Sequence, residues 1–260
     1  MKNSFDSFLY PGAHVKYAVD IFGVTFEPFS TTPPNNKVKT VTFEKEEPGN
    51  PLNTKFFMTF HLGPVSSLEE AKKISELEKD SLLDIVSFEI MAKIGDPRCV
   101  EHNLMSRPRE GAQVHCLFPP RQMKAMGTVG DRKVNKEEIK KIKKHIKDKP
   151  LKNRRLLSLF RRALLIDDVV SQFLMLYLIL DVKIGVQRGA QLKIDALLRS
   201  LSPNIEESPD PRYPKRKETC YTRLRNEITH RGTNPQKTNG EILERSYDFK
   251  RLVKLAIQRA

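Results

Sequence analysis

The stretch from Glu218 to Gly232, ETCYTRLRNEITHRG, decides how the fold of this 260-residue chain is interpreted. It contains no proline, and its only glycine is the last residue, so it predicts a helix with Gly232 as the C-cap. Pro235 follows and is expected to prevent the helix from continuing. One side of the predicted helix is apolar, because apolar residues recur at i, i+3 and i+7: Tyr221, Leu224 and Ile228.

A second side of the predicted helix is polar. Thr222, Asn226 and His230 are spaced four residues apart, so they form a ladder along this side. Arg225 lies five residues before His230, about 140° away around an α-helix at roughly 100° per residue. Its long side chain still reaches towards the ladder. The helix therefore presents a cation, an amide and an imidazole close together.

These three groups suit chemistry on a phosphodiester. Arginine and asparagine bind phosphate oxygens through hydrogen bonds, and the arginine bond is charge-assisted. Histidine titrates near neutral pH and can transfer a proton. Together they supply what the attack of a ribose 2′-hydroxyl on its own phosphodiester requires. RNA carries this nucleophile itself, so neither a metal nor a cofactor is expected.

The motif Arg225-Asn226-x-x-x-His230 resembles the Arg-x4–6-His motif of HEPN-domain ribonucleases, in which a polar residue follows the arginine. The wider string Tyr-Thr-x-Leu-Arg-Asn-Glu-Ile-x-His-Arg resembles the C-terminal domain of methylamine-utilisation J-type proteins and other HEPN proteins. The resemblance covers about residues 150–260 and leaves the first half of the chain unexplained.

The resemblance implies a homodimer, formed through the C-terminal helices, that brings two copies of the motif to one cleft. His230 would act as general base or acid, Arg225 would stabilise charge on the phosphoryl oxygens, and Asn226 would orient the phosphate or the imidazole. Thr222 and Arg231 are weaker candidates for phosphate binding. Many HEPN proteins are toxins or antiphage effectors, so a regulatory or neutralising partner is also implied, although nothing in the sequence identifies one.

Three other interpretations stay open. The domain could bind RNA or nucleotides without cleaving them, or it could be an accessory protein with no role in nucleic-acid chemistry. The polar residues of the motif could also form an ordinary exposed helix face with salt bridges, because short motifs recur by chance.

The composition favours an anionic partner. The formal net charge is +14 and the isoelectric point about 9.7, which is typical of proteins that bind nucleic acid or an anionic surface. The three cysteines, Cys99, Cys116 and Cys220, form no CxxC pair, so they predict neither a disulfide framework nor a zinc site and suit the reducing cytoplasm. The longest apolar run, from Phe173 to Leu180, is too short to cross a membrane, and we expect no signal peptide.

Much of the positive charge is concentrated in residues 131–162, which hold fourteen Lys and Arg against four acids. Ile139, Ile142 and Ile146 predict an amphipathic helix with a lysine face. Such runs are usually solvated faces or linkers. Next to a candidate ribonuclease domain, however, they also suit RNA phosphates. The candidate RNA-binding residues here are Lys140, Lys141, Lys144, Arg154 and Arg155.

The whole chain is predicted to be an α+β protein with three parts. Residues 1–130 form a β-rich domain with three strands before residue 64 and one long helix from Ser66 or Ser67 to about Ile94, and this domain has a possible regulatory or sensing role. Residues 96–130 are expected to be mostly irregular, with one or two strands around 113–118. Residues 131–149 form the basic helix or a linker.

Residues 150–260 are predicted to form an all-α, HEPN-like bundle. Five helices are expected, at 151–166, 169–184, 191–201, the motif, and 240–258, with a loop at 202–215 that contains four prolines.

Overall fold

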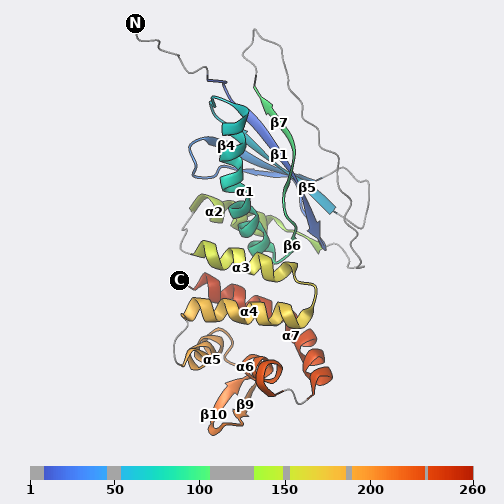
Figure 1. Ribbon diagram of the computed structural model, residues 1–260, viewed down its shortest axis with the longest axis vertical. Helices are drawn as coiled ribbons and strands as arrows, with labels where there is room; N and C mark the ends of the chain where they lie inside the picture. Colours follow the sequence, from blue (N-terminus) through green and yellow to red (C-terminus); the bar gives the residue numbers. More distant parts are fainter. Residues whose placement is uncertain are drawn as a thin grey trace. The chain divides into compact units, whose positions relative to one another are not determined.

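The computed structural model describes residues 9–45, 54–105, 132–148, 153–185, 189–231 and 234–259. The chain divides into two compact units, Met1–Leu151 and Lys152–Ala260 (Figure 1). The first unit contains the sheet and the second contains the motif stretch. The predicted mixed α and β architecture is therefore confirmed.

The first unit is built on a six-stranded sheet whose paired strands are all antiparallel. β5 (Thr54–Leu62) and β1 (Ala13–Phe22) lie at its centre, and the order is β3-β4-β5-β1-β6, with β7 also paired to β1. The remaining strands are β3 (Phe29–Thr31), β4 (Val38–Lys45), β6 (Lys93–Ile94) and β7 (Arg98–Leu104). Side chains of β1 alternate between buried and half-buried along most of the strand, as expected for a sheet with one face against the core.

Helix α1 (Leu68–Ile90) packs against this sheet. Ser67 is its N-cap and accepts a hydrogen bond from the Glu70 backbone N–H at 3.1 Å. The Tyr17 hydroxyl of β1 lies 2.8 Å from the Ser75 hydroxyl of α1. The helix ends at Met91, which adopts a left-handed conformation with φ of 50°, and so it is shorter than predicted.

Strand β7 corrects the prediction that the chain is irregular after residue 96. It pairs along β1 from Ala13 to Ala18, with an irregular register between Lys16 and Tyr17. This irregularity breaks the two-residue alternation that would have marked the strand in the sequence. The strands expected at 113–118, and Cys116 with them, lie outside the described residues.

Helix α2 (Lys136–Asp148) belongs to the first unit. It buries Ile142 and Ile146, as its amphipathic pattern predicted. His145 Nδ1 lies 2.9 Å from the Glu89 carboxylate of α1, which fixes one end of α2 on that helix. Two short strands, β2 (Val24–Thr25) and β8 (Arg132–Lys133), pair in parallel just before α2.

The second unit contains helices α3 (Arg154–Leu165), α4 (Val169–Ile184), α5 (Ala190–Leu201), α6 (Cys220–Asn226) and α7 (Pro235–Gln258). Its core joins α4, α6 and α7 through aromatic rings. Tyr221 stacks on Phe249 with centroids 4.5 Å apart, and Phe173 lies 4.8 Å from the same ring. Asp168 is the N-cap of α4, as predicted.

Two sequence predictions for this unit are wrong. The segment expected to be a loop contains a β-hairpin of β9 (Glu207–Asp210) and β10 (Tyr213–Thr219), so the unit is not all-α. Its prolines are tolerated because a two-stranded hairpin leaves edge positions whose backbone N–H is not needed for pairing. The last helix was predicted to begin at residue 240, but α7 begins at Pro235. A proline is tolerated at the first position of a helix because its missing N–H has no partner there.

In the described part of the chain, no helix has both the length and the apolar character needed to cross a membrane.

Candidate functional site

The structure brings Arg225, Asn226 and His230 into contact. The Arg225 Nη1 atom donates a hydrogen bond to Asn226 Oδ1 at 3.1 Å and lies 3.3 Å from His230 Nε2. A guanidinium group has only donors, so Nε2 must be the acceptor in this contact. The tautomer that accepts this bond carries its proton on Nδ1. The two groups predicted for charge stabilisation and proton transfer therefore interact directly.

A π-helical turn at Glu227–Arg231 explains how Arg225 and His230 meet. In an α-helix, residues five apart point about 140° away from each other. A π-turn bonds residue i to residue i+5 and places them on one side, and such turns are frequent at functional sites. The Thr229 hydroxyl donates to the Arg225 carbonyl at 2.9 Å, which satisfies an acceptor at the irregular turn.

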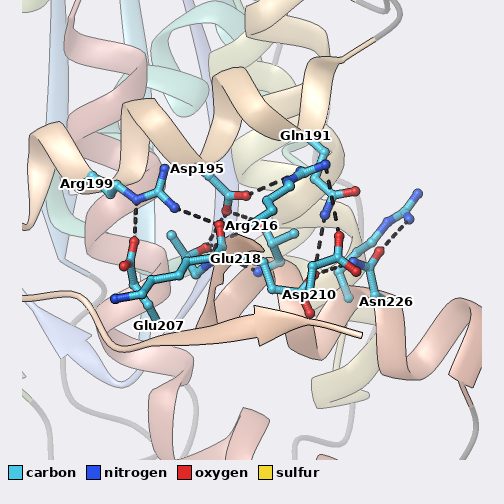
Figure 2. A network of polar contacts seen from close by, with 12 residues as sticks. Gln191, Asp195, Arg199, Glu207, Asp210, Arg216, Glu218 and Asn226 are labelled. Atoms are coloured by element: carbon cyan, nitrogen blue, oxygen red, sulfur yellow. Dashed lines mark hydrogen bonds and ion pairs between the residues drawn. The ribbon is translucent and has the colours of Figure 1, made fainter. Parts of the chain in front are cut away.

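Burial differs sharply across the three residues. Asn226 is only 1% exposed, Arg225 is half-buried, and His230 is exposed to solvent. Asn226 Nδ2 donates to the buried carboxylate of Glu218 at 2.9 Å (Figure 2). Because the amide nitrogen faces Glu218, its oxygen is left to accept from Arg225. Glu218 therefore sets the orientation of the amide that holds the arginine.

Thr222 does not fit its predicted role in phosphate binding. It is fully buried, and its hydroxyl donates to Asp195 Oδ1 at 2.6 Å and lies 3.0 Å from the Tyr177 hydroxyl. The polar ladder of the sequence is thus divided, with Thr222 and Asn226 facing the interior and only His230 facing solvent. The angular spacing placed these residues on one side correctly, but it could not show what covers that side.

Asp195 of α5 is the centre of the buried network. Its Oδ1 atom accepts from the Thr219 backbone N–H at 3.2 Å and from the Thr219 hydroxyl at 2.8 Å, in addition to Thr222. Thr219 is the N-cap of α6. One fully buried carboxylate therefore ties the start of the motif helix to α5.

Arg225 also contacts helix α4. Its guanidinium lies 5.9 Å from the centroid of the Tyr177 ring, within the range of a cation–π contact. Burial raises the pKa of the Tyr177 phenol, so it stays neutral. Burial also raises the pKa of the Asp181 carboxyl, and the nearby charge of Arg225 partly opposes this. Helix α4 thus contributes to the surroundings of the arginine an aromatic face and an acidic group whose charge it influences.

The β-hairpin is fixed to the same network (Figure 2). Arg199 of α5 forms an ion pair with Glu207 of β9 and donates to the Lys217 carbonyl of β10 at 2.9 Å. Arg216 points inward, with its guanidinium nitrogens 3.9 Å from Asp195 and 4.0 Å from Asp210. Both strands of the hairpin are therefore bound to the elements that position the motif.

The remaining predicted residues occupy separate places. Lys140, Lys141 and Lys144 are exposed on α2 of the first unit, and Arg154 and Arg155 are exposed at the start of α3 in the second. Arg231 lies in the π-turn, but its side chain is outside the described part of the structure. Among the described residues, no cluster of three or more His, Cys, Asp or Glu side chains suits a metal ion.

Sequence reasoning assigned no role to Tyr177, Asp195 or Glu218. Asp195 did leave a signal, since it follows Ile194 and precedes Leu198 on an otherwise apolar face of its helix. A carboxylate at such a position is rarely buried without several donors around it. Tyr177 gave no signal, because an aromatic residue within an apolar helix normally indicates packing alone.

The second unit is therefore a helical domain with a β-hairpin, in which Arg225 and Asn226 at the end of α6 meet His230 of the π-turn. No protein-family model matches the chain, and neither curated proteins nor solved structures gave a match. The resemblance to HEPN ribonucleases remains a prediction from the motif.

Proposed function

We propose that this protein is a metal-independent endoribonuclease of the HEPN type, acting on RNA as a toxin or defence effector. The observation that supports this most directly is the contact of Arg225 with both the buried Asn226 and the solvent-exposed His230. Arg225 would bind a phosphoryl oxygen and His230 would transfer the proton, while Asn226 would hold the arginine in place. The net charge of +14 supports an anionic substrate.

The proposed reaction is an internal transesterification. The 2′-oxygen forms a bond to phosphorus as the bond from phosphorus to the 5′-oxygen breaks. One imidazole takes the proton of the 2′-hydroxyl, and an imidazolium protonates the departing 5′-oxygen. The products are a 2′,3′-cyclic phosphate and a 5′-hydroxyl. DNA lacks the attacking group and would not be cleaved.

Substrate binding would also prepare the base. In the free protein, Arg225 Nη1 faces the lone pair of His230 Nε2 at 3.3 Å. A phosphate is a stronger, charge-assisted acceptor than a neutral imidazole. When Arg225 turns to a phosphate, it releases Nε2, which is then able to accept the 2′-hydroxyl proton. The arginine would thereby couple binding to proton transfer.

A two-fold dimer would supply two copies of His230, one as base and one as acid. An exposed apolar pair on α7 is a candidate for the dimer contact: Leu243 is 64% exposed and Tyr247 is 65% exposed, one helical turn apart. Helix α7 packs on the π-turn, where the Thr238 hydroxyl donates to Glu227 at 3.0 Å. A dimer through this helix would thus involve the element next to the site.

Replacing Leu243 with Glu and Tyr247 with Ser is therefore expected to convert a dimer into monomers. Charge in an apolar contact opposes association, while both positions are solvent-exposed and tolerate polar residues within the protomer. Size-exclusion chromatography with light scattering measures the change, and RNA cleavage should fall at least tenfold with it. Leu77→Glu, at an equally exposed residue of the first unit, is the matched control. A double variant that stays dimeric would show that α7 does not form the contact.

The test of the function is incubation of the purified protein with total RNA and tRNA in EDTA, with analysis of the ends formed. Fragments with cyclic-phosphate ends that depend on His230 are expected. RNA binding without cleavage would instead favour a non-catalytic RNA-binding module, in which Lys140, Lys141 and Lys144 would be the first residues to examine.

A further inference from the structure

The outer part of the β9–β10 hairpin carries positive charge and one aromatic ring on its surface. Residues 211–217, Pro-Arg-Tyr-Pro-Lys-Arg-Lys, contain four cations and no acid. Arg212, Lys215 and Lys217 are exposed, and Tyr213 is 61% exposed. We propose that these four side chains, which we call the basic arm, bind single-stranded RNA and guide it into the Arg225–His230 site. This inference rests on the proposed function and names the form of its substrate.

The arm is rigidly held at its base, which distinguishes it from a mobile basic loop. Asp210, Glu218 and Thr219 of the hairpin are fully buried. Glu218 pairs with Ser208 and Thr219 with Glu207 across the two strands. The contacts of Arg199 bind both strands to α5. A fixed arm loses less conformational entropy when it binds a ligand, so each contact contributes more to affinity.

The four cations of residues 211–217 differ in their surroundings, since one points into the protein and three are exposed to solvent. Arg216 points inward between Asp195 and Asp210, so its charge is balanced within the protein. Its neighbours Lys215 and Lys217 are exposed, as strand alternation predicts. Arg212 lies 3.7 Å from Asp210 but keeps an exposed side chain. The inner cation thus fixes the arm, while the outer cations are available for phosphates.

The arm leads directly into the site. β10 ends at Thr219, and α6 begins with Cys220. Between Lys217 and Arg225 the path is at most about 18 Å, at about 3.3 Å per extended residue and 1.5 Å per helical residue. The bond from Glu218 to Asn226 joins the hairpin to the site over an even shorter distance. One strand of a few nucleotides could contact both.

The chemistry of the arm favours a single strand over a duplex. Proteins that bind single-stranded nucleic acid combine cations along the backbone with aromatic rings that stack on unpaired bases. The Tyr213 ring can stack on a base only where that base is unpaired and accessible. A cleavage site of the proposed kind also needs a flexible backbone, so that the 2′-oxygen can align with the leaving oxygen.

The test is a binding measurement that does not depend on cleavage. The probe is a fluorescein-labelled 12-nucleotide RNA with 2′-O-methyl riboses, which lacks the attacking hydroxyl, and anisotropy is followed with the full-length protein. Tyr213→Ala is expected to weaken binding about 5- to 150-fold, the equivalent of one lost base stack. The salt dependence is the slope of log K plotted against the logarithm of the salt concentration. The double variant Lys215→Ser with Lys217→Ser should make this slope less steep by about 1.4.

The control variants carry the same types of substitution, Tyr to Ala and Lys to Ser, in the first unit. Tyr10→Ala, and Lys39→Ser with Lys73→Ser, alter exposed residues of the first unit and should leave binding unchanged. Wild-type affinity and salt dependence in both arm variants would overturn the inference, as would equal, arm-dependent binding to a duplex of the same sequence. If the wild type cleaves RNA and the arm variants bind normally, only this inference fails. If RNA binding depends on the basic arm but no cleavage occurs, the role of the arm in RNA binding is supported and the ribonuclease proposal fails.

Discussion

His230→Ala is expected to lower the rate of RNA cleavage by about 10²- to 10⁴-fold, the usual contribution of a positioned acid or base. The imidazole is exposed at the π-turn, so its loss removes no core contact and the variant should fold normally. RNA binding should stay within about twofold of wild type, because the phosphate contact is assigned to Arg225. The measurement is the initial rate of cleavage of a labelled RNA in EDTA, together with an identification of the ends.

Two further variants make this result specific. Gln236→Ala changes an exposed residue at the start of α7 and should cleave at the wild-type rate. Arg225→Lys keeps a positive charge but cannot contact Asn226 and His230 from one planar group, so cleavage should fall about 10²-fold or more. Equal cleavage by wild type and His230→Ala would indicate a contaminating nuclease or another site, and would remove the assigned role of the imidazole.

Asp195→Ala is expected to destabilise the second unit by about 3 kcal/mol. The fully buried carboxylate accepts hydrogen bonds from the Thr219 backbone N–H, the Thr219 hydroxyl and the Thr222 hydroxyl. Removing it leaves these donors buried without an acceptor, and each unsatisfied buried donor costs about 1–3 kcal/mol. Some of this cost is recovered as hydroxyls rotate towards other acceptors. Urea unfolding monitored by circular dichroism measures the difference.

The matched control is Asp248→Ala on α7, where the side chain is 65% exposed and lies 3.9 Å from Arg251. An exposed ion pair contributes little, so the free energy of unfolding should change by less than about 0.5 kcal/mol. Asp195→Ala should also reduce cleavage, because Thr219 and Thr222 position the start of α6. A loss of stability no larger than that of Asp248→Ala would show that Asp195 does not organise the network.

The sequence predicted the helices of the second unit and the central strands of the first because those elements carry local signals. In the second unit, helix α4 follows the N-cap Asp168. In the first unit, helix α2 was predicted as well, because its core face repeats isoleucine at helical spacing. The alternating pattern of β1 and β5 likewise reflects a sheet with one buried face. The residues of the candidate site were also selected from the sequence alone, because an arginine, an amide and a histidine lie within six positions of one helix.

The hairpin was missed because its prolines favour a loop in any local interpretation. It is stabilised by Arg199, which joins α5 to β9, and by Arg216, which lies near Asp195 of α5 and Asp210 of the opposite strand. Strand β7 was missed because the irregular register opposite Lys16 and Tyr17 of β1 interrupts the two-residue alternation that marks a strand in the sequence.

The sequence by itself determined the composition of the candidate site and the side of the helix on which it lies. Only the tertiary structure decided which members of that site face solvent. Asp195 and Glu218 draw Thr222 and Asn226 into a buried network, because buried carboxylates require hydrogen-bond donors. The π-turn then brings His230 round towards Arg225, whereas a regular α-helix would place the two residues about 140° apart around its axis.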